Sequence, residues 1–541
     1  MKKVSSVALA LLFAASAFAY EQIGQLNPYA YNVQGQAKNG KIAVSYSLNT
    51  AADSTIVAIY CDEALVGTQV VADNAPGLHS AVVDLADFTA PGKYTVGIRV
   101  FKQSYDKPFQ LKELVDLPGG GQSTDTTALN YAFFHPKGVD IDVDPFSENF
   151  GRILTDECMQ NTPDAGYHSS TDKAGIYAFD PAFKPIANGN DRAYKGGLTF
   201  VTTMSNGSTQ AYTPYRIRIS KDGRIFATMQ DDVLSPLYEL SKDLQTWTPI
   251  FNGAMVDGVM SDADGNYISG INCGLDLIGE GENLEIVMLN MNTTGFSSYN
   301  GKDWTVARYK IGTNTSWTGA ATKADSLSKF IGEAAVPVAA SAGIAMDDNG
   351  GFWFHSARAD MIPQRGLCHV SAAGAVDFEF HATAADTAKY HILPAGSNGG
   401  AGCRIIKLDG DDVLFVGMGR NISGCGHMMA YKVIYAADGT VSDLEVKYDE
   451  HFIGISTNLN DFAIDFGHNL YTVGNSNEKI IPIALPYSGM TETPVNAEVI
   501  KEGQGLNNID GQVKAVKMIE NGKVIILKNG VKYDMLGTVV E

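Results

Sequence analysis

The chain has 541 residues, of which 18% are charged and 45% hydrophobic, with 56 glycines and only 6 cysteines. This composition excludes a disordered chain, a collagen and a small disulfide-stapled protein. The 60 Asp and Glu residues outnumber the 40 Lys and Arg residues, and the resulting net charge of -20 repels phosphate backbones and anionic membranes. Nucleic acid is therefore not an expected partner.

The first nineteen residues have the features of a cleavable signal peptide. Lys2 and Lys3 precede an apolar stretch over residues 7–13, and Ala17 and Ala19 supply the small residues of a cleavage site. This stretch is too short for a membrane-spanning helix, which needs about 20 apolar residues, and no later stretch is long enough. We expect cleavage after Ala19, no transmembrane segment, and a secreted or outer-cell-surface location.

Residues 20–110 are expected to form a small β-sandwich. Apolar and polar residues alternate in short runs between Asn-Gly and Pro-Gly turn signals, a pattern typical of half-buried strands. The segments VSYSLNTAADSTIVAIY, PGLHSAVVDL and APGKYTVGIRV resemble, in this order, the immunoglobulin-like domain of flagellar hook-assembly proteins. That resemblance implies a spacer or docking module. Residues 111–130 include LPGGGQSTDTT, whose composition predicts a flexible linker.

Residues 131–510 repeat an apolar strand, an Asp/Asn/Gly turn and an aromatic-rich strand. Examples are IRISKDGRIFAT from 217, GIAMDDNGGFWFHS from 343 and FAIDFGHNLYTVG from 462. Short antiparallel units of this kind cannot bury both faces alone, and closing them into a ring removes the sheet edges. The pattern predicts an all-β protein built on a β-propeller of six to eight blades, most simply seven.

The repeat turns resemble those of NHL-repeat and gluconolactonase-like bacterial propellers, and GVDIDVDPFSENFGRI from 138 is similar to the first blade of exported bacterial propellers. No catalytic signature of these families is present. A two-sheet sandwich and a parallel β-helix are the rival architectures, although the chain shows no period near the 20 residues of a β-helix.

Residues 511–541 are expected to form a short hairpin segment, because Asn-Gly turns stand between alternating apolar residues at Asn521 and Asn529. The segment resembles the C-terminal sorting domains of the type IX secretion system in its two Asn-Gly turns, Tyr533 and Gly537. The resemblance implies recognition by the secretion machinery, whereas a hairpin that only stabilises the chain is the alternative. The end in Glu541 departs from the basic ending common in such domains.

Cysteine, histidine and acidic residues give little support for a metal site or a nucleophile. The six cysteines form no C-x-x-C pair, which disfavours a zinc site; buried free thiols are favoured over disulfides. Asp140, Asp142 and Asp144 alternate along one strand and are compatible with calcium, although bonding to nearby backbone amides explains them better. No other cofactor is expected. Cys425 and His427 share a strand face, but buried packing is the simpler interpretation.

Two sets of residues are candidates for ligand binding. Arg216 and Arg218 alternate along YRIRIS, and both are candidates for facing the central channel, where arginine binds anionic groups; a solvated strand face is the alternative. Tyr299, Trp304 and Trp317 lie in polar segments outside the repeats. Exposed aromatic rings stack on sugars, whereas packing of a long loop would explain the same residues.

These observations favour a binding protein that uses loops on one propeller face to recognise a glycan or another surface protein. A carbohydrate-active lyase or hydrolase with its site at the channel mouth is the first alternative, and a structural component of the cell envelope is the second. No catalytic residue is assigned, because a pair of carboxylates is unavoidable among 60 acidic residues.

Overall fold

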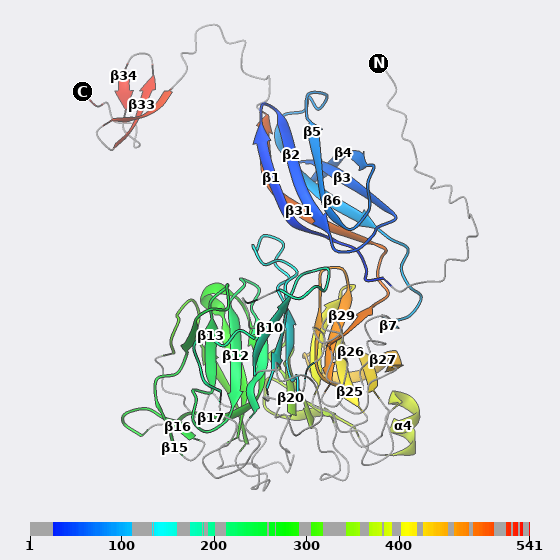
Figure 1. Cartoon of the computed structure of the whole chain (residues 1–541), viewed down its shortest axis with the longest axis vertical. Helices are drawn as coiled ribbons and strands as arrows, with labels where there is room; N and C mark the ends of the chain where they lie inside the picture. The colour runs from blue at the N-terminus through cyan, green and yellow to red at the C-terminus, as the bar shows by residue number, and fades with distance from the viewer. Residues whose placement is uncertain are drawn as a thin grey trace.

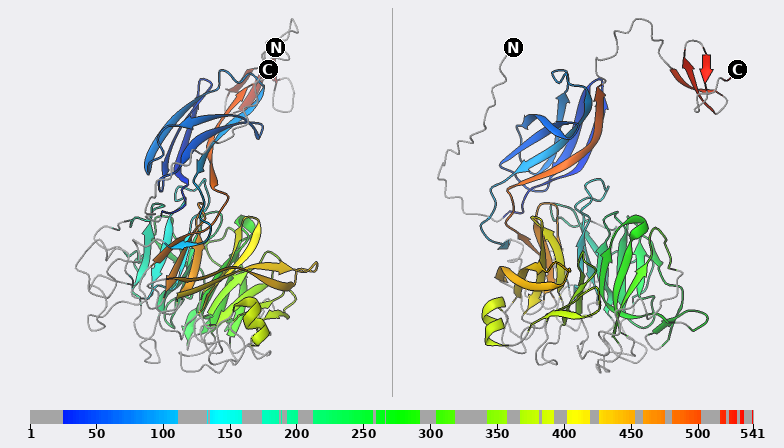
Figure 2. Two further views of the ribbon diagram at one scale, coloured as in Figure 1. Left: turned by 90° about the vertical axis from the view of Figure 1, so that its right-hand side faces the viewer. Right: turned by 180° about the vertical axis from the view of Figure 1, so that it is seen from behind.

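The computed structural model describes residues 25–110, 133, 135–158, 174–186, 188, 193–200, 212–256, 259–265, 267–291, 304–317, 342–356, 367–380, 383–391, 402–418, 426–452, 459–474, 480–501, 516–520, 523–528, 531–533 and 540. Figures 1 and 2 show a small two-sheet unit standing on one side of a larger ring of sheets. The expected signal peptide (1–19) and the linker (111–130) lie outside the described residues. No helix within these ranges is long and apolar enough to cross a membrane.

The small unit is a sandwich of two antiparallel sheets. One has the order β1 (Ala30–Lys38), β2 (Lys41–Leu48), β5 (Gly77–Asp84), and the other has the order β31 (Met490–Lys501), β6 (Gly92–Phe101), β3 (Ser54–Cys61), β4 (Ala64–Val71). The alternate residues predicted to be apolar form its core, which includes the fully buried Tyr46, Val57 and Ile98. The period-two pattern thus sets which side chains face the opposite sheet.

Six sheets form the ring, and we number them as blades 1 to 6 in chain order. They are β8 (Val139–Ile141), β9 (Ile153–Glu157), β10 (Gly175–Phe179); β11 (Tyr212–Ile219), β12 (Ile225–Gln230), β13 (Leu237–Leu240), β14 (Trp247–Pro249); β15 (Ala254–Val256), β16 (Val259–Ser261), β17 (Tyr267–Ile278), β18 (Glu285–Met291), β19 (Trp304–Lys310); β20 (Ala342–Met346), β21 (Phe352–Ser356), β22 (Leu367–Val370), β23 (Val376–Glu379); β24 (Cys403–Leu408), β25 (Asp411–Met418), β26 (Gly426–Tyr435), β27 (Val441–Phe452); and β28 (Leu459–Ile464), β29 (Asn469–Gly474), β30 (Ile480–Ala484), β7 (Phe109–Gln110). The 3-10 turn η2 (Gly281–Asn283) lies in blade 3, and helix α4 (Ala384–Tyr390) lies between blades 4 and 5.

The inner strands of these sheets contact one another in a closed cycle. Strand β8 contacts β11, β11 contacts β17, and the series continues through β20, β24 and β28 back to β8. This closure defines a β-propeller. The described residues form six blades, one fewer than the seven expected and within the range of six to eight. Positive φ at turn residues such as Gly223 and Gly350 agrees with the predicted Asp/Gly turns.

Two strands connect the sandwich and the ring: one precedes the ring in the sequence and the other follows it. Strand β7, which precedes the ring, completes blade 6 by pairing with β30. Strand β31 follows the ring and pairs with β6 of the sandwich, from Met490 opposite Phe101 to Lys501 opposite Gly92. The sequence placed residues 490–501 in the propeller, but the structure places them in the sandwich, because β6 would otherwise be an open sheet edge.

The joint between the units is made of buried aromatic and amide groups. The ring of Tyr29 packs edge-on against Phe150, at 5.8 Å between centroids, and lies 6.1 Å from the ring of Phe466. Asn27 donates to the backbone oxygen of Leu485 (2.8 Å), and its own N–H donates to Asn469 Oδ1 (2.6 Å). The sandwich therefore stands on the turns that follow the inner strands of blades 1 and 6.

The C-terminal residues form a separate three-stranded antiparallel sheet. It consists of β32 (Val516–Glu520), β33 (Lys523–Lys528) and β34 (Val531–Tyr533), with β33 in the middle. The antiparallel pairing of β32 with β33 and of β33 with β34 agrees with the predicted hairpins, while the two Asn-Gly pairs lie outside the described residues.

Candidate functional site: a charged channel and the pocket at its mouth

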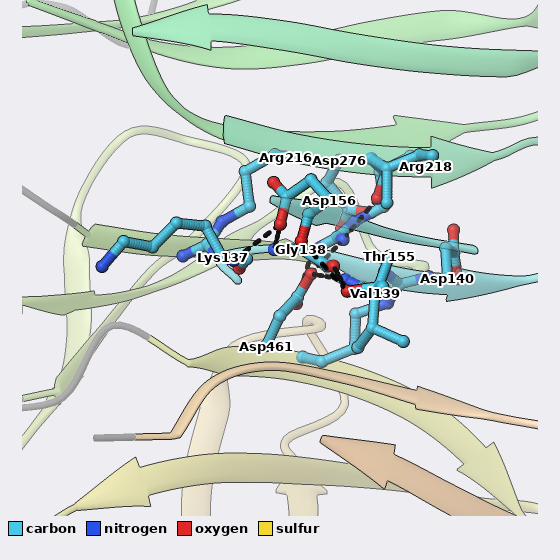
Figure 3. Close-up of polar contacts among 12 residues, drawn as sticks. Lys137, Gly138, Val139, Asp140, Thr155, Asp156, Arg216, Arg218, Asp276 and Asp461 are labelled. Carbon is cyan, nitrogen blue, oxygen red and sulfur yellow. Dashed lines mark hydrogen bonds and ion pairs between the residues drawn. The ribbon is translucent and has the colours of Figure 1, made fainter. Parts of the chain in front are cut away.

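An ion pair crosses the centre of the ring. Arg218 on β11 donates from Nη1 to Asp461 Oδ2 (2.6 Å) and from Nη2 to Oδ1 (2.9 Å), and Asp461 lies on β28. The two side chains are 3% and 1% exposed. The N–H of Val139 also donates to Asp461 Oδ2 (3.1 Å). Burial would raise the pKa of Asp461, but Arg218 and the other arginines lower it overall, so the carboxylate is charged. Figure 3 shows how this pair joins blades 2, 6 and 1.

Asp140 joins its own strand to two further blades at the channel wall. Its Oδ2 accepts the backbone N–H of Ile219 (2.7 Å) and its Oδ1 accepts Arg404 Nη2 (3.1 Å). Asp140 belongs to blade 1, Ile219 to blade 2 and Arg404 to blade 5. A carboxylate on one inner strand therefore accepts the backbone N–H of the next blade, and Asp461 has the same relation to Val139.

Asp276 on β17 repeats this arrangement on the opposite side. Its Oδ2 accepts the backbone N–H of Met346 in blade 4 (2.7 Å), and its Oδ1 accepts that of Leu277 (2.9 Å). Arg218 Nε lies 3.9 Å from Asp276 Oδ1, which is too long for a hydrogen bond. Burial raises the pKa of Asp276, although Arg404 and Arg218 act to lower it.

Asp156 and Arg216 lie beside Lys137 and Gly138, next to the Arg218–Asp461 pair (Figure 3). Asp156 Oδ1 accepts the backbone N–H groups of Lys137 (2.6 Å) and Gly138 (2.8 Å), while Arg216 donates to the backbone oxygen of Lys137. Complete burial raises the pKa of Asp156 to about 8, against the opposing effect of these hydrogen bonds and of Arg216. The Asp156 carboxyl group is therefore mostly protonated at neutral pH.

A pocket of about 360 Å³ opens where the inner strands end. All six blades contribute to its wall, and it opens on the side of the ring that carries the sandwich. Its charged lining side chains are four cations and five acids: Arg218, Lys221, Arg404, Lys407, Asp140, Asp276, Asp347, Asp348 and Asp412. Apolar side chains from all six blades, among them several isoleucines, Met346 and Ala463, complete the lining.

Two buried N–H groups of the pocket-lining arginines have no partner. Arg218 Nε and Arg404 Nη1 are inaccessible to solvent and make no hydrogen bond to any described residue. Such groups are rare in folded proteins, because an unpartnered buried donor costs about 1–3 kcal/mol. Both arginines line the pocket, and a small rotation of either side chain would bring its unpartnered N–H to a ligand oxygen.

The structure places the candidate ligand-binding residues in three different situations. Arg216 and Arg218 are both buried on the inner strand of blade 2 and Arg218 lines the pocket, which excludes a solvated strand face, while their binding of a ligand stays a prediction. Trp317 is half-buried and packs edge-on against Tyr309 and Phe251, at 5.3 and 6.0 Å between ring centroids. Packing therefore accounts for Trp317. Tyr299 and the side chain of Trp304 lie outside the described residues.

The acidic strand of blade 1 forms turns and ion pairs. Asp142 accepts the backbone N–H of Asp144 (3.2 Å) and the hydroxyl of Ser147 (2.6 Å), and Asp144 accepts the N–H of Phe146 (2.9 Å). Together with the Asp140–Arg404 pair, these contacts match the bonding to nearby groups that the sequence favoured over calcium. Cys61, Cys158 and Cys403 are buried free thiols, as favoured, and Cys425 lies outside the described residues.

Sequence reasoning missed Asp276, Arg404 and Asp461 as channel residues. The signal that locates them is their distance from the blade turn. Arg218 stands two residues before Ser220. The backbone N–H of Ser220 donates to the backbone oxygen of Arg224 and so closes the blade turn. Asp461 stands four residues before Asp465, which closes the equivalent turn with Asn469. Alternate positions before each turn therefore face the channel.

No family model matches this chain, and no curated protein matches it. Similar solved structures include a Bacteroides thetaiotaomicron protein of unknown function, at 10% identity and a TM-score of 0.39 over 84% of this chain and 100% of that one. A glucose dehydrogenase has 11% identity and a TM-score of 0.35 over 66% and 98% of the two chains. A Bacillus subtilis glycoside hydrolase family 43 arabinoxylan arabinofuranohydrolase has 10% identity and a TM-score of 0.27 over 86% and 94%. Likeness at these scores carries no argument, so the propeller assignment depends on the sheet order and the closed cycle of inner strands.

Proposed function

We propose that this protein binds a neutral, hydroxyl-rich ligand, a sugar unit of a glycan, in the pocket at the channel mouth. The observation that carries this proposal is the pair of unpartnered N–H groups, Arg218 Nε and Arg404 Nη1, in residues that line the pocket. Sugar hydroxyl and ring oxygens accept hydrogen bonds from such donors. Both guanidinium groups already have carboxylate partners through other nitrogen atoms.

The charge of the pocket favours a neutral ligand over an ionic one. The chain carries a net charge of -20, yet the pocket wall has four cationic and five acidic side chains. Lys407 is paired with both Asp348 (3.1 Å) and Asp412 (2.6 Å) at the rim. An anion would meet the acidic groups and a cation the basic ones, whereas hydroxyl groups donate to carboxylates and accept from guanidinium groups.

The location proposed for this binding is the outer cell surface or the extracellular medium. The signal-peptide pattern and the resemblance of residues 511–541 to a type IX sorting domain support it. The sandwich then acts as the immunoglobulin-like spacer or docking module, and a surface protein is a second class of partner. Deletion of residues 511–541 should abolish surface display, and unchanged display would refute the sorting role.

A glycan array with the mature chain, residues 20–541, tests the binding proposal. We expect Arg404→Met to abolish binding to the glycans that the wild-type chain retains, because it removes the Nη1 donor while keeping an apolar stem. Arg308→Met is the matched control, because Arg308 pairs with Glu285 on blade 3 and is absent from the pocket lining. An array that stays blank for the wild-type chain, or equal binding by the Arg404→Met variant, would refute the proposal.

Cleavage of the bound glycan is the second candidate function, and Asp276 favours it. Burial raises the pKa of this pocket carboxyl group, which is the property that a general acid needs. If the protein is a hydrolase or lyase, Asp276→Asn should abolish turnover of a polysaccharide while binding on the array persists. Binding without turnover by the wild-type chain would leave the protein as a binding protein.

A further inference from the structure

Four histidine and aspartate side chains meet at the outer edge of blade 5, away from the channel. His427 on β26 is directly opposite His451 on β27 in the antiparallel ladder. Asp449 precedes His451 by two residues and so lies on the same face of β27. His391 follows the last residue of α4 and reaches the same carboxylate. Three segments that are distant in sequence thus converge on Asp449.

The contacts within this group are short. A ring nitrogen of His427, Nε2, lies 2.7 Å from Asp449 Oδ1, and His391 Nδ1 lies 2.8 Å from Oδ2. The rings of His427 and His451 are stacked, with centroids 4.2 Å apart and an angle of 4° between the planes. One potential ligand atom from each of His427, Asp449 and His451 lies within 4.8 Å of the others, and no other trio converges in this way among the described residues.

A second observation distinguishes this cluster from a surface ion pair. The His427 side chain is 2% exposed, and its Nδ1 has no hydrogen-bond partner among the described residues. Asp449 and His451 are exposed, so the buried imidazole lies beneath a side that is open to solvent. Because Nε2 is the nitrogen that faces Asp449, Nδ1 points away from the cluster, and this imidazole would meet a metal ion through Nε2.

We propose that His427, Asp449 and His451 bind a zinc ion. Imidazole nitrogen and carboxylate oxygen are ligands that zinc prefers, whereas calcium and magnesium require sets of oxygen ligands. Ligand atoms about 2.1 Å from a tetrahedral zinc are roughly 3.4 Å apart, so a rotation of the exposed His451 side chain suffices to replace the ring stack by coordination. Three protein ligands leave the fourth position to water or to a ligand.

His391 has a different role in this site. Its Nδ1 contacts Asp449 Oδ2, the oxygen that does not contact His427. Partners of this kind orient a ligating carboxylate, and their loss weakens metal binding about 10- to 100-fold. The site is independent of the proposed function, because His427, Asp449 and His451 belong to the two outer strands of the blade and none of them lines the channel-mouth pocket.

Isothermal titration of the chelator-stripped mature chain with zinc chloride tests this inference. We expect one ion per chain, loss of binding in His451→Ala and in Asp449→Asn, and binding weakened about 10- to 100-fold in His391→Gln. His468→Gln is the control, because His468 lies in blade 6 against Tyr487, and it should bind as the wild type does. His451 is exposed, so its replacement leaves the fold intact, and unfolding curves without metal verify this for each variant.

Substitution by cobalt supplies a second readout. Tetrahedral coordination of cobalt by the wild-type chain should give intense visible absorption bands that are absent in His451→Ala. Failure of the wild-type chain to bind zinc stoichiometrically, or equal zinc binding by the His451→Ala and Asp449→Asn variants, would overturn the proposal. Glycan binding by the channel pocket should be the same in all these variants.

Discussion

Replacing Asp461 by asparagine should weaken the propeller more than any change of a surface ion pair. The carboxylate makes two hydrogen bonds with Arg218 (2.6 and 2.9 Å) and accepts the N–H of Val139 (3.1 Å). Both side chains of the pair are almost fully buried. Breaking a buried pair by removing one partner leaves the other charge uncompensated and costs about 3–5 kcal/mol. We therefore expect Asp461→Asn to lower the free energy of unfolding by that amount.

Unfolding in urea, followed by tryptophan fluorescence, measures this change. All four tryptophans, at positions 247, 304, 317 and 353, belong to the ring, so the signal reports on the propeller. Arg308→Gln is the control, because Arg308 and Glu285 are partly exposed and such pairs contribute about 1 kcal/mol or less. The double variant Arg218→Met/Asp461→Asn should lose less than the sum of the two single variants, since neither charge remains alone. An Asp461→Asn effect no larger than that of the control would refute the reasoning.

Three further predictions concern pH, the joint and the return strand. Burial raises the pKa of Asp156 to about 8, whereas an unfolded aspartate ionises near pH 4; between these values the folded chain holds the extra proton, and its stability falls by at most about 1.4 kcal/mol per pH unit. Relative to Asp156→Asn, the wild-type chain should therefore lose stability in urea from pH 5 to pH 8, and a difference that is constant with pH would contradict this. Gly467→Ala would place a Cβ 2.7 Å from the Tyr29 ring and 2.8 Å from Asn27 O, so limited proteolysis should separate the sandwich from the ring faster than in the wild type. A chain that ends at residue 486 lacks β31 and leaves β6 as an open edge, so it should aggregate in size-exclusion chromatography, whereas a chain that ends at residue 505 should stay monodisperse.

Local patterns predicted the strands and their closure into a ring. The alternation along residues 42–48 and the Asp/Gly turns after each inner strand are local signals, and both are present in the structure. The return of residues 490–501 to the sandwich was not predictable in this way. Its pattern indicates a half-buried strand, but the partner strand β6 lies about 400 residues earlier, and nothing local specifies a pairing across that distance.

The candidate site was likewise predictable from the sequence only in part. The alternation of Arg216 and Arg218 placed both side chains on one face of a strand; both are buried, and Arg218 lines the pocket. Asp276, Asp461 and Arg404 could not be chosen from the sequence, because their roles depend on partners in other blades. Among 60 acidic residues, only burial and convergence distinguish the few that line the channel from the many that form turns. The pairing of His427 with His451 likewise depends on strand register.

The most direct test of the central claim is a crystal structure of the mature chain soaked with a sugar that binds on the array. We expect the sugar in the channel-mouth pocket, with its oxygen atoms within hydrogen-bond distance of Arg218 Nε and Arg404 Nη1, which have no partner among the described residues. A sugar bound on another surface, with the pocket unchanged, would contradict it.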